Sequence, residues 1–405
     1  MKKTIFDKTF TQQEPIPRSA INGAVKVLKT GRLHRYNTIE GELSETALLE
    51  KEYAFWQKSK YCLATTSGGT ALQIALRAVG VKAGTKVLTN AFTLAPVPGA
   101  ISAVGGMPVL IETTKDLTID FDHLLKTIKT SKAKFMLISH MRGHLSDMES
   151  LMKILSKHKI CLIEDCAHTM GASWKNKKSG NFGSIACFST QTYKHINSGE
   201  GGFITTNDKK LIASAILLSG SYMLYNKHLS APQESEFKKL KFLMPNCSSR
   251  MDNLRASILR PQLKKIIPNQ KKWNIRHDFF KNKLSKISGI YVPLRPLQES
   301  YVGSSFQFLI SENWSRRSIE RFIKSVKKRG VELKWFGDLD PKGYTSRHES
   351  WKYFPAQNLK NTSKVMHQLI DMRIPLTFTL KDCQIIYKII EEELLIEYKK
   401  SKYLN

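Results

Sequence analysis

The chain has 405 residues and a formal net charge of +30, and its 41% hydrophobic and 24% charged residues are typical of a folded protein with its own core. No apolar run approaches the roughly 20 residues that cross a bilayer, and the N-terminus lacks the apolar segment of a signal peptide, so we expect a cytoplasmic protein with no membrane partner. Lys and Arg are spread along the chain, and the densest stretch, 264–286, alternates with apolar residues at near-helical spacing, which favours a solvated helix face over a nucleic-acid partner.

Short apolar runs alternate with amphipathic segments between residues 60 and 230. Two helices are expected ahead of this block, at 20–30 and 44–56. Inside it, the pattern predicts strands at 61–64, 86–89, 108–111, 135–138, 161–163, 185–188 and 203–205, and helices at 70–79, 95–104, 121–128 and 147–157. This alternation predicts a large, mostly parallel sheet with helices on both faces, which is an α/β fold.

The pattern changes after residue 230. We expect helical structure at 250–287, a strand at 302–310, an amphipathic helix at 315–328, a short strand at 331–333, an irregular lobe at 337–363 and a helix at 383–398. The chain is therefore predicted to have two parts. The first, residues 1–250, holds an N-terminal segment and the large α/β domain, and the second, residues 251–405, is a smaller α+β domain.

The turn Ser67-Gly68-Gly69-Thr70 stands between a predicted strand and a predicted helix. Backbone N–H groups at a helix N-terminus bind anions, so this turn is a possible phosphate site. A serine followed by two glycines is also typical of an ordinary capped turn.

Two residues farther along have the chemistry that pyridoxal phosphate requires. Asp165 follows the apolar strand at 161–163, and Lys194 lies between a strand and the glycine cluster 199–202. The cofactor requires an amine to hold its aldehyde and an anion to keep its ring nitrogen protonated. The alternatives are a helix-capping acid and a surface lysine.

Three more side chains fit the same site. His168 follows Asp165 by three residues, Ser189 offers a hydroxyl for a phosphate, and Phe92 follows the strand at 86–89, where an aromatic ring stacks on a cofactor or joins the core. The six cysteines have no zinc-ligand spacing, so no metal site is expected. Ligand sites in open α/β sheets lie at the carboxyl ends of strands, where these residues are predicted to lie.

The ordered set of motifs resembles the DegT/StrS family of sugar aminotransferases, which have the fold-type I architecture of pyridoxal-phosphate enzymes. The resemblance is carried by Thr66-Ser67-Gly68-Gly69-Thr70-Ala71-Leu72, Phe92-Thr93, His140 with Gly143 and Asp147-Met148, Ile163 to His168 with Gly171-Ala172, Phe188 to Gly202, and Arg373-Ile374-Pro375-Leu376.

The resemblance implies a role for each residue. Lys194 would form the Schiff base and move the substrate proton, Asp165 would pair with the ring nitrogen, and His168 would lie near the ring hydroxyl. The phosphate would be held by Ser67, Gly68, Gly69 and Ser189, with Phe92 stacked on the ring and Tyr193 near the substrate.

The family's active site also takes residues from a partner chain, which implies a homodimer. The matching segment here is 246–254, where Asn246 and Ser248 would contact the phosphate and Arg250 the substrate. This chain departs from the family pattern, because an Asn-x-Arg motif is usual and here Ser248 stands two residues before Arg250. The turn Ser67-Gly68-Gly69 likewise replaces the usual Ser-Gly-Thr, and the lobe 335–351 is long and is expected to form a specificity wall.

The resemblance implies an aminotransferase that moves nitrogen from glutamate or glutamine to a keto-sugar, in particular a nucleotide-linked one, or to a keto-cyclitol, through pyridoxamine phosphate. One alternative is the family's dehydratase branch, whose members replace the lysine with histidine, and His195 stands beside Lys194. A second alternative is a non-catalytic, nucleic-acid-binding regulator, which the charge of +30 favours.

Overall fold

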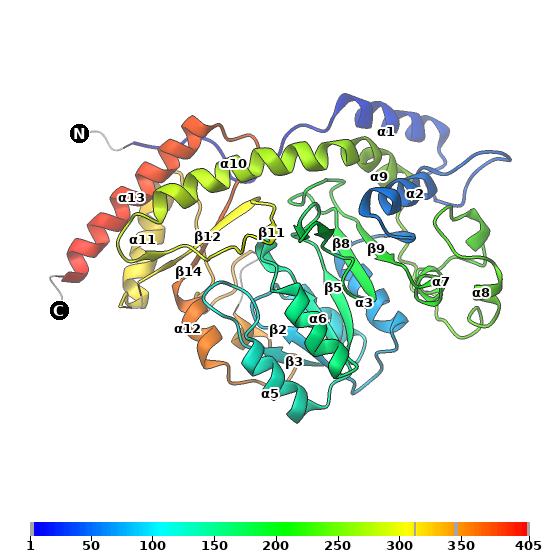
Figure 1. Cartoon of the computed structure of the whole chain (residues 1–405). Helices are drawn as coiled ribbons and strands as arrows, with labels where there is room; N and C mark the ends of the chain where they lie inside the picture. Colours follow the sequence, from blue (N-terminus) through cyan, green and yellow to red (C-terminus); the bar gives the residue numbers. More distant parts are fainter. Residues whose placement is uncertain (1–3, 312, 344–346, 403–405) are drawn as a thin grey trace.

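The computed structural model describes residues 4–311, 313–343 and 347–402. Its large sheet has seven strands in the order β1-β9-β8-β5-β4-β2-β3 (Figure 1). The strands are β1 (Tyr61–Thr65), β2 (Lys86–Asn90), β3 (Met107–Ile111), β4 (Phe135–Ser139), β5 (Cys161–Asp165), β8 (Ile185–Ser189) and β9 (Gly202–Thr206). β9 pairs antiparallel with β1 and β8 and the other pairs are parallel, so the predicted mostly parallel α/β sheet is confirmed.

Alternate residues of these strands enter two different cores, as the period of two in a strand requires. In β1, Leu63 packs into one core while Cys62 and Ala64 pack into the other. The Leu63 face is covered by α3 (Gly68–Ala78), α4 (Pro96–Ala103) and α7 (Lys209–Leu218). The other face is covered by α2 (Glu45–Gln57), α5 (Phe121–Ser131), α6 (Met148–Lys157) and α9 (Asn253–Leu259).

A second, antiparallel sheet has the order β10-β12-β14-β13, with β10 (Ile290–Tyr291), β12 (Ser305–Ile310), β13 (Lys334–Trp335) and β14 (Leu369–Arg373). Around it lie α11 (Arg316–Lys328), α12 (Lys360–Gln368) and α13 (Leu380–Lys402). The long helix α10 (Ile266–Leu284) runs along the top of Figure 1 from this part of the molecule to α9.

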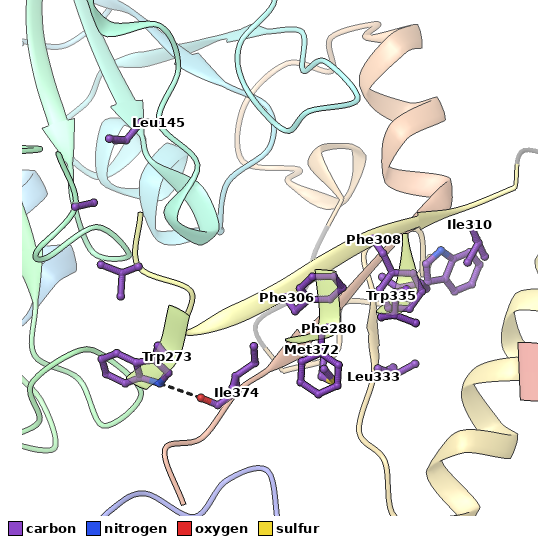
Figure 2. Close-up of a cluster of buried hydrophobic side chains, with 14 of the residues drawn as sticks. Leu145, Trp273, Phe280, Phe306, Phe308, Ile310, Leu333, Trp335, Met372 and Ile374 are labelled. Carbon is purple, nitrogen blue, oxygen red and sulfur yellow. Dashed lines mark hydrogen bonds between the residues drawn. The ribbon is translucent and has the colours of Figure 1, made fainter. Parts of the chain in front are cut away.

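Figure 2 shows the apolar core of the second sheet, where Phe306 and Phe308 of β12 lie with Met372 of β14 and Phe280 of α10. The Trp273 Nε1–H of α10 donates a hydrogen bond of 2.9 Å to the Ile374 carbonyl, which fixes the end of β14 against the helix.

The remaining elements are short or peripheral. They are α1 (Arg18–Thr30), α8 (Ser235–Lys238), the small sheet of β6 (Ser173–Trp174), β7 (Lys177–Lys178) and β11 (Glu299–Ser300), and the 3₁₀ turns η1 (Met141–Gly143), η2 (Tyr225–Lys227), η3 (Arg260–Lys265) and η4 (His348–Ser350). Across the part of the chain that the structure describes, no helix combines the length and the apolarity that a membrane crossing requires.

The structure differs from the sequence-based prediction mainly in the second part. The predicted strand at 331–333 is wrong, because the ladder forms only at Lys334–Trp335, where the chain meets β14. The pattern also missed β14, whose sequence Leu-Ile-Asp-Met-Arg interrupts an apolar run with buried Asp371. The division at residue 250 stays a prediction, and the structure adds that N-terminal Phe6 and Phe10 pack edge-on against Phe378 of the second part.

Candidate active site

The turn after β1 forms an anion cradle with the end of β8. Ser67 caps α3, and its side chain accepts the Thr70 N–H at 3.0 Å. Gly68 lies so close to β8 that an added Cβ would stand 2.8 Å from the Cβ of Ser189. The first turn of a helix has backbone N–H groups without intrahelical partners, and here Ser67, Gly68, Gly69 and Ser189 all line one cavity. The cradle fits a phosphate.

Gly68→Ala is expected to weaken phosphate binding, because its Cβ would push Ser189 out of the cradle; overpacking of this kind costs about 1–3 kcal/mol. Gly69→Ala is the matched control, since its Cβ would meet only the Ser67 Oγ at 3.8 Å. Equilibrium dialysis with pyridoxal phosphate measures both. Equal affinities for the two variants would contradict the cradle.

Asp165 ends β5 at the floor of the cavity and is 6% exposed. Its carboxylate accepts the Ser139 Oγ–H at 2.8 Å and the Ala167 N–H at 3.1 Å. The two donors come from different segments and hold the carboxylate in one orientation, so a buried anion with a fixed orientation faces the cavity. Such an anion requires a positive group opposite it, which a protonated ring nitrogen would supply.

Lys194 lies in the loop between β8 and β9, and its Nζ shares a hydrogen bond of 3.1 Å with His168 Nε2. Burial lowers the pKa of Lys194 to about 7; Arg142 and Arg373 lower it further, while Asp165 opposes them. Burial, then Lys194 and Arg142, hold the pKa of His168 well below its usual value. A neutral amine is therefore available near neutral pH, and only the neutral amine is a nucleophile.

Acetylation of Lys194 by acetic anhydride, a reagent that does not itself titrate in this range, is expected to rise through a midpoint near pH 7 rather than near 10.5. The sign follows from burial, which disfavours the ammonium, so the reactive neutral form is already present above about pH 7. Peptide mass spectrometry of cofactor-free protein at a series of pH values measures the rate. A midpoint close to 10.5 would show that the amine is not desolvated.

The cavity has a volume of about 570 Å³ and walls from both sheets. The large sheet and its loops contribute Thr93, Leu94, Ser139, Arg142 and Glu200, and the second part of the chain contributes Glu332, Lys334 and Arg373. Tyr193 lies between the two parts, because the Arg373 guanidinium stacks over its ring at 3.5 Å. Gly343 of the predicted specificity lobe lines the cavity, whereas Tyr344, Thr345 and Ser346 lie outside the described residues.

The expected stacking role of Phe92 is wrong. Its side chain is 1% exposed and packs edge-on against Phe336 at 5.3 Å, inside a separate apolar cluster. Asn90 Nδ2 donates to the Phe92 carbonyl at 2.7 Å, and this bend after β2 presents Thr93 and Leu94 to the cavity instead. Leu94, rather than Phe92, therefore lines the cavity.

Three predicted residues lie away from the cavity of their own chain. Asn246 and Ser248 are exposed, and the Asn246 Oδ1 accepts the Ser248 N–H at 2.9 Å. Arg250 donates to the Gly220 carbonyl at 2.8 Å and lies over the Tyr222 ring. Their contacts with a partner chain stay a prediction.

Sequence reasoning missed Arg142, Arg373, Ser139 and Glu200. Ser139 ends β4 beside Asp165, so its position at a strand end was an available signal. Glu200 and Arg373 stand inside motifs that carried the family resemblance, but no pattern in the sequence assigns their side chains to the cavity.

Buried His140, Glu164 and Cys166 gather close enough to hold a metal ion. The Glu164 carboxylate already accepts the N–H groups of Gly180, Phe182 and Gly183 at 2.7–2.9 Å and contacts His140 Nε2 at 3.0 Å. We therefore assign this cluster to the support of the loop after β7.

The chain is similar to aminotransferases of known structure and sequence. It is 32% identical over 218 residues to a GDP-perosamine synthase of Caulobacter vibrioides, a match that covers 54% of this chain and 56% of the relative. It is 29% identical over 258 residues to an L-glutamine:2-deoxy-scyllo-inosose aminotransferase of Micromonospora echinospora, covering 62% of this chain and 61% of the relative. The matches thus span less than two thirds of these curated relatives.

The fold is shared with an aminotransferase from Psychrobacter cryohalolentis, with a TM-score of 0.82 at 22% identity over 97% of this chain and 100% of that one. A family model matches residues 21–391, nearly the whole chain, and this range contains the phosphate cradle, Asp165 and Lys194. The protein therefore belongs to the DegT/DnrJ/EryC1/StrS aminotransferase family.

Proposed function

We propose that this protein is a pyridoxal-phosphate-dependent aminotransferase. It moves an amino group from glutamate or glutamine to a nucleotide-linked keto-sugar or to a keto-cyclitol. The observation that carries the proposal is one cavity holding a desolvated lysine, a fixed buried carboxylate and an anion cradle, at Lys194, Asp165 and Ser67-Gly68-Gly69 with Ser189. Family membership and the names of the relatives support the same chemistry.

Each residue has a defined task in this proposal. When bound, the cofactor supplies a ring that withdraws electrons from the substrate carbon. Lys194 Nζ would hold the cofactor aldehyde, and its free amine would carry the proton from the substrate carbon. His168 Nε2, at 3.1 Å from that amine, orients it, and the Asp165 carboxylate keeps the ring nitrogen protonated.

The proposed assembly is a cytoplasmic homodimer. The loop with Asn246, Ser248 and Arg250 is partly or fully exposed and lies away from the cavity of its own chain, which suits residues that act across a dimer interface. In this proposal Asn246 and Ser248 reach the partner's phosphate and Arg250 reaches its substrate.

The dehydratase alternative is disfavoured by the position of His195. Its Nε2 lies 3.3 Å from Ser304 Oγ, its ring packs edge-on against Trp273, and it does not line the cavity that holds Asp165 and the phosphate cradle. Lys194 therefore holds the reactive position, which supports transamination.

A spectral screen tests the proposal. The purified protein with pyridoxal phosphate is expected to absorb at roughly 410–430 nm, as a protonated lysine–cofactor bond does. Glutamate, glutamine, aspartate and alanine are added separately, and the donor is the one that removes the band. Protein that binds the cofactor yet keeps the band with all four donors would contradict transamination with these donors, and steep salt-dependent DNA binding without cofactor would favour the regulator.

A further inference from the structure

Two arginines stand in the cavity beyond the groups that the cofactor requires. Arg142 follows β4 in the large sheet, and Arg373 ends β14 in the second sheet, yet both line the same cavity. Both also lie close enough to Lys194 to lower its pKa.

One face of β12 and β14 is polar, buried and turned toward Arg142. The opposite face carries the apolar core of Figure 2, with Phe306 and Met372. On the polar face, Gln307 Nε2 donates to Asp371 Oδ1 at 2.7 Å, and Asp371 Oδ2 forms an ion pair of 2.9 Å with Arg142. Asp371 and Arg373 are two residues apart on one strand, so both side chains point to this face. Both guanidinium groups therefore line the cavity from this side.

Arg142 has an unfavourable backbone conformation in this arrangement. Arg142 is 5% exposed and has φ 53° and ψ 25°, the left-handed region that side chains rarely adopt. Its anchor Asp371 is fully buried, and Gln307, which positions Asp371, is itself held by His144 at 3.0 Å. A strained, buried cation with a dedicated support at a cavity wall is typical of a binding function.

The arginines do not belong to the phosphate cradle. The end of β4 lies two strands from the end of β8, where Ser189 stands, and two strand spacings are about 10 Å. Asp165, at the end of β5, lies between them. Arg142 thus lies on the far side of Asp165, where a substrate would bind, and Arg373 lines the same cavity.

We propose that Arg142 and Arg373 form a carboxylate-binding subsite of this cavity and so select a substrate that carries a carboxylate. Guanidinium groups bind carboxylates through two parallel hydrogen bonds, which gives both affinity and orientation. The carboxylate belongs either to the amino-acid donor or to an acidic keto-sugar. This inference rests on the proposed function, because it names the substrate class of the same site.

Calorimetric titration of the cofactor-loaded protein with two acids tests the subsite. Glutarate represents the amino-acid donor, and its neutral match is glutaramide. D-Glucuronate represents the acidic sugar, and its neutral match is D-glucose. Arg142→Gln and Arg373→Gln are each expected to weaken binding of at least one acid about tenfold to a hundredfold, and not that of its neutral match. Arg317→Gln, at an exposed position on α11, is the matched charge control.

The outcomes separate the two sources of the carboxylate. Loss of glutarate binding alone assigns the donor, loss of D-glucuronate binding alone assigns the sugar, and loss of both assigns a shared subsite. Equal affinities in the wild type, both variants and Arg317→Gln would overturn the proposal, as would wild-type protein that prefers neither acid to its neutral match.

Two further measurements keep these outcomes interpretable. Arg142→Gln leaves the buried Asp371 carboxylate without this ion pair, so the double variant Arg142→Gln/Asp371→Asn removes both charges together. The band at roughly 410–430 nm is read in every sample. If the wild type shows the band but its binding of the acids does not depend on the arginines, the subsite alone is refuted. If the wild type does not show the band, the proposed function is refuted.

Discussion

Lys194→Ala is expected to lower the rate of transamination by at least about 10⁴-fold, because one amine both holds the cofactor and carries the substrate proton. Lys194 is one of the many lysines of a chain with 64 Lys and Arg residues, but it is the one whose Nζ contacts His168 in the cavity with Asp165 and the phosphate cradle. Single-turnover kinetics with the donor found by the spectral screen measure the loss.

Lys178→Ala is the matched control. Burial, followed by Lys58, lowers the pKa of Lys178 to about 8, so it is a second lysine with an acidified amine, but its Nζ lies over the Trp56 ring at 3.6 Å, outside the cavity. We expect its activity to stay within about twofold of the wild type, since surface and support positions rarely alter catalysis. A Lys194→Ala protein that retains activity would show that the cofactor is held by another amine.

Asp165→Asn is expected to lower the rate about 10²- to 10³-fold, the range found when one preorganised electrostatic partner is removed. The amide keeps the shape and can still accept a hydrogen bond from Ser139 or Ala167, so the fold and the cradle are retained. What is lost is the negative charge that holds a proton on the ring nitrogen.

The control for this change is Asp208→Asn, which caps α7 beyond the end of β9 and accepts the Lys210 N–H at 2.7 Å. Asparagine caps a helix as well as aspartate does, so neither stability nor activity should change much. If the two variants were equally active, Asp165 would be a structural acid rather than the partner of the ring.

The large sheet and half of the site were predictable because both depend on local patterns. Apolar runs give the strands, and the carboxyl ends of parallel strands meet at one edge, so Asp165 and Ser189 come together without any knowledge of packing. The Ser67 cap and the glycines after it are likewise local signals.

The remainder depends on contacts between distant segments. Phe92 was misplaced because strand alternation stops at Asn90, where a side-chain hydrogen bond bends the chain and turns Leu94 inward. Arg142 and Arg373 come from the two different sheets, and only the packing of β14 against the loop after β4 brings them to one cavity. A buried Asp371 in a five-residue strand also hides β14 from any apolar pattern.

The central claim is that Lys194 carries the cofactor, and borohydride reduction tests it most directly. Reduction of the protein loaded with pyridoxal phosphate makes the lysine–cofactor bond permanent, and digestion with mass spectrometry locates it. We predict one modified residue, Lys194, with protease cleavage after it blocked. Modification at Lys178 or another lysine, or none in protein that binds the cofactor, would contradict the assignment.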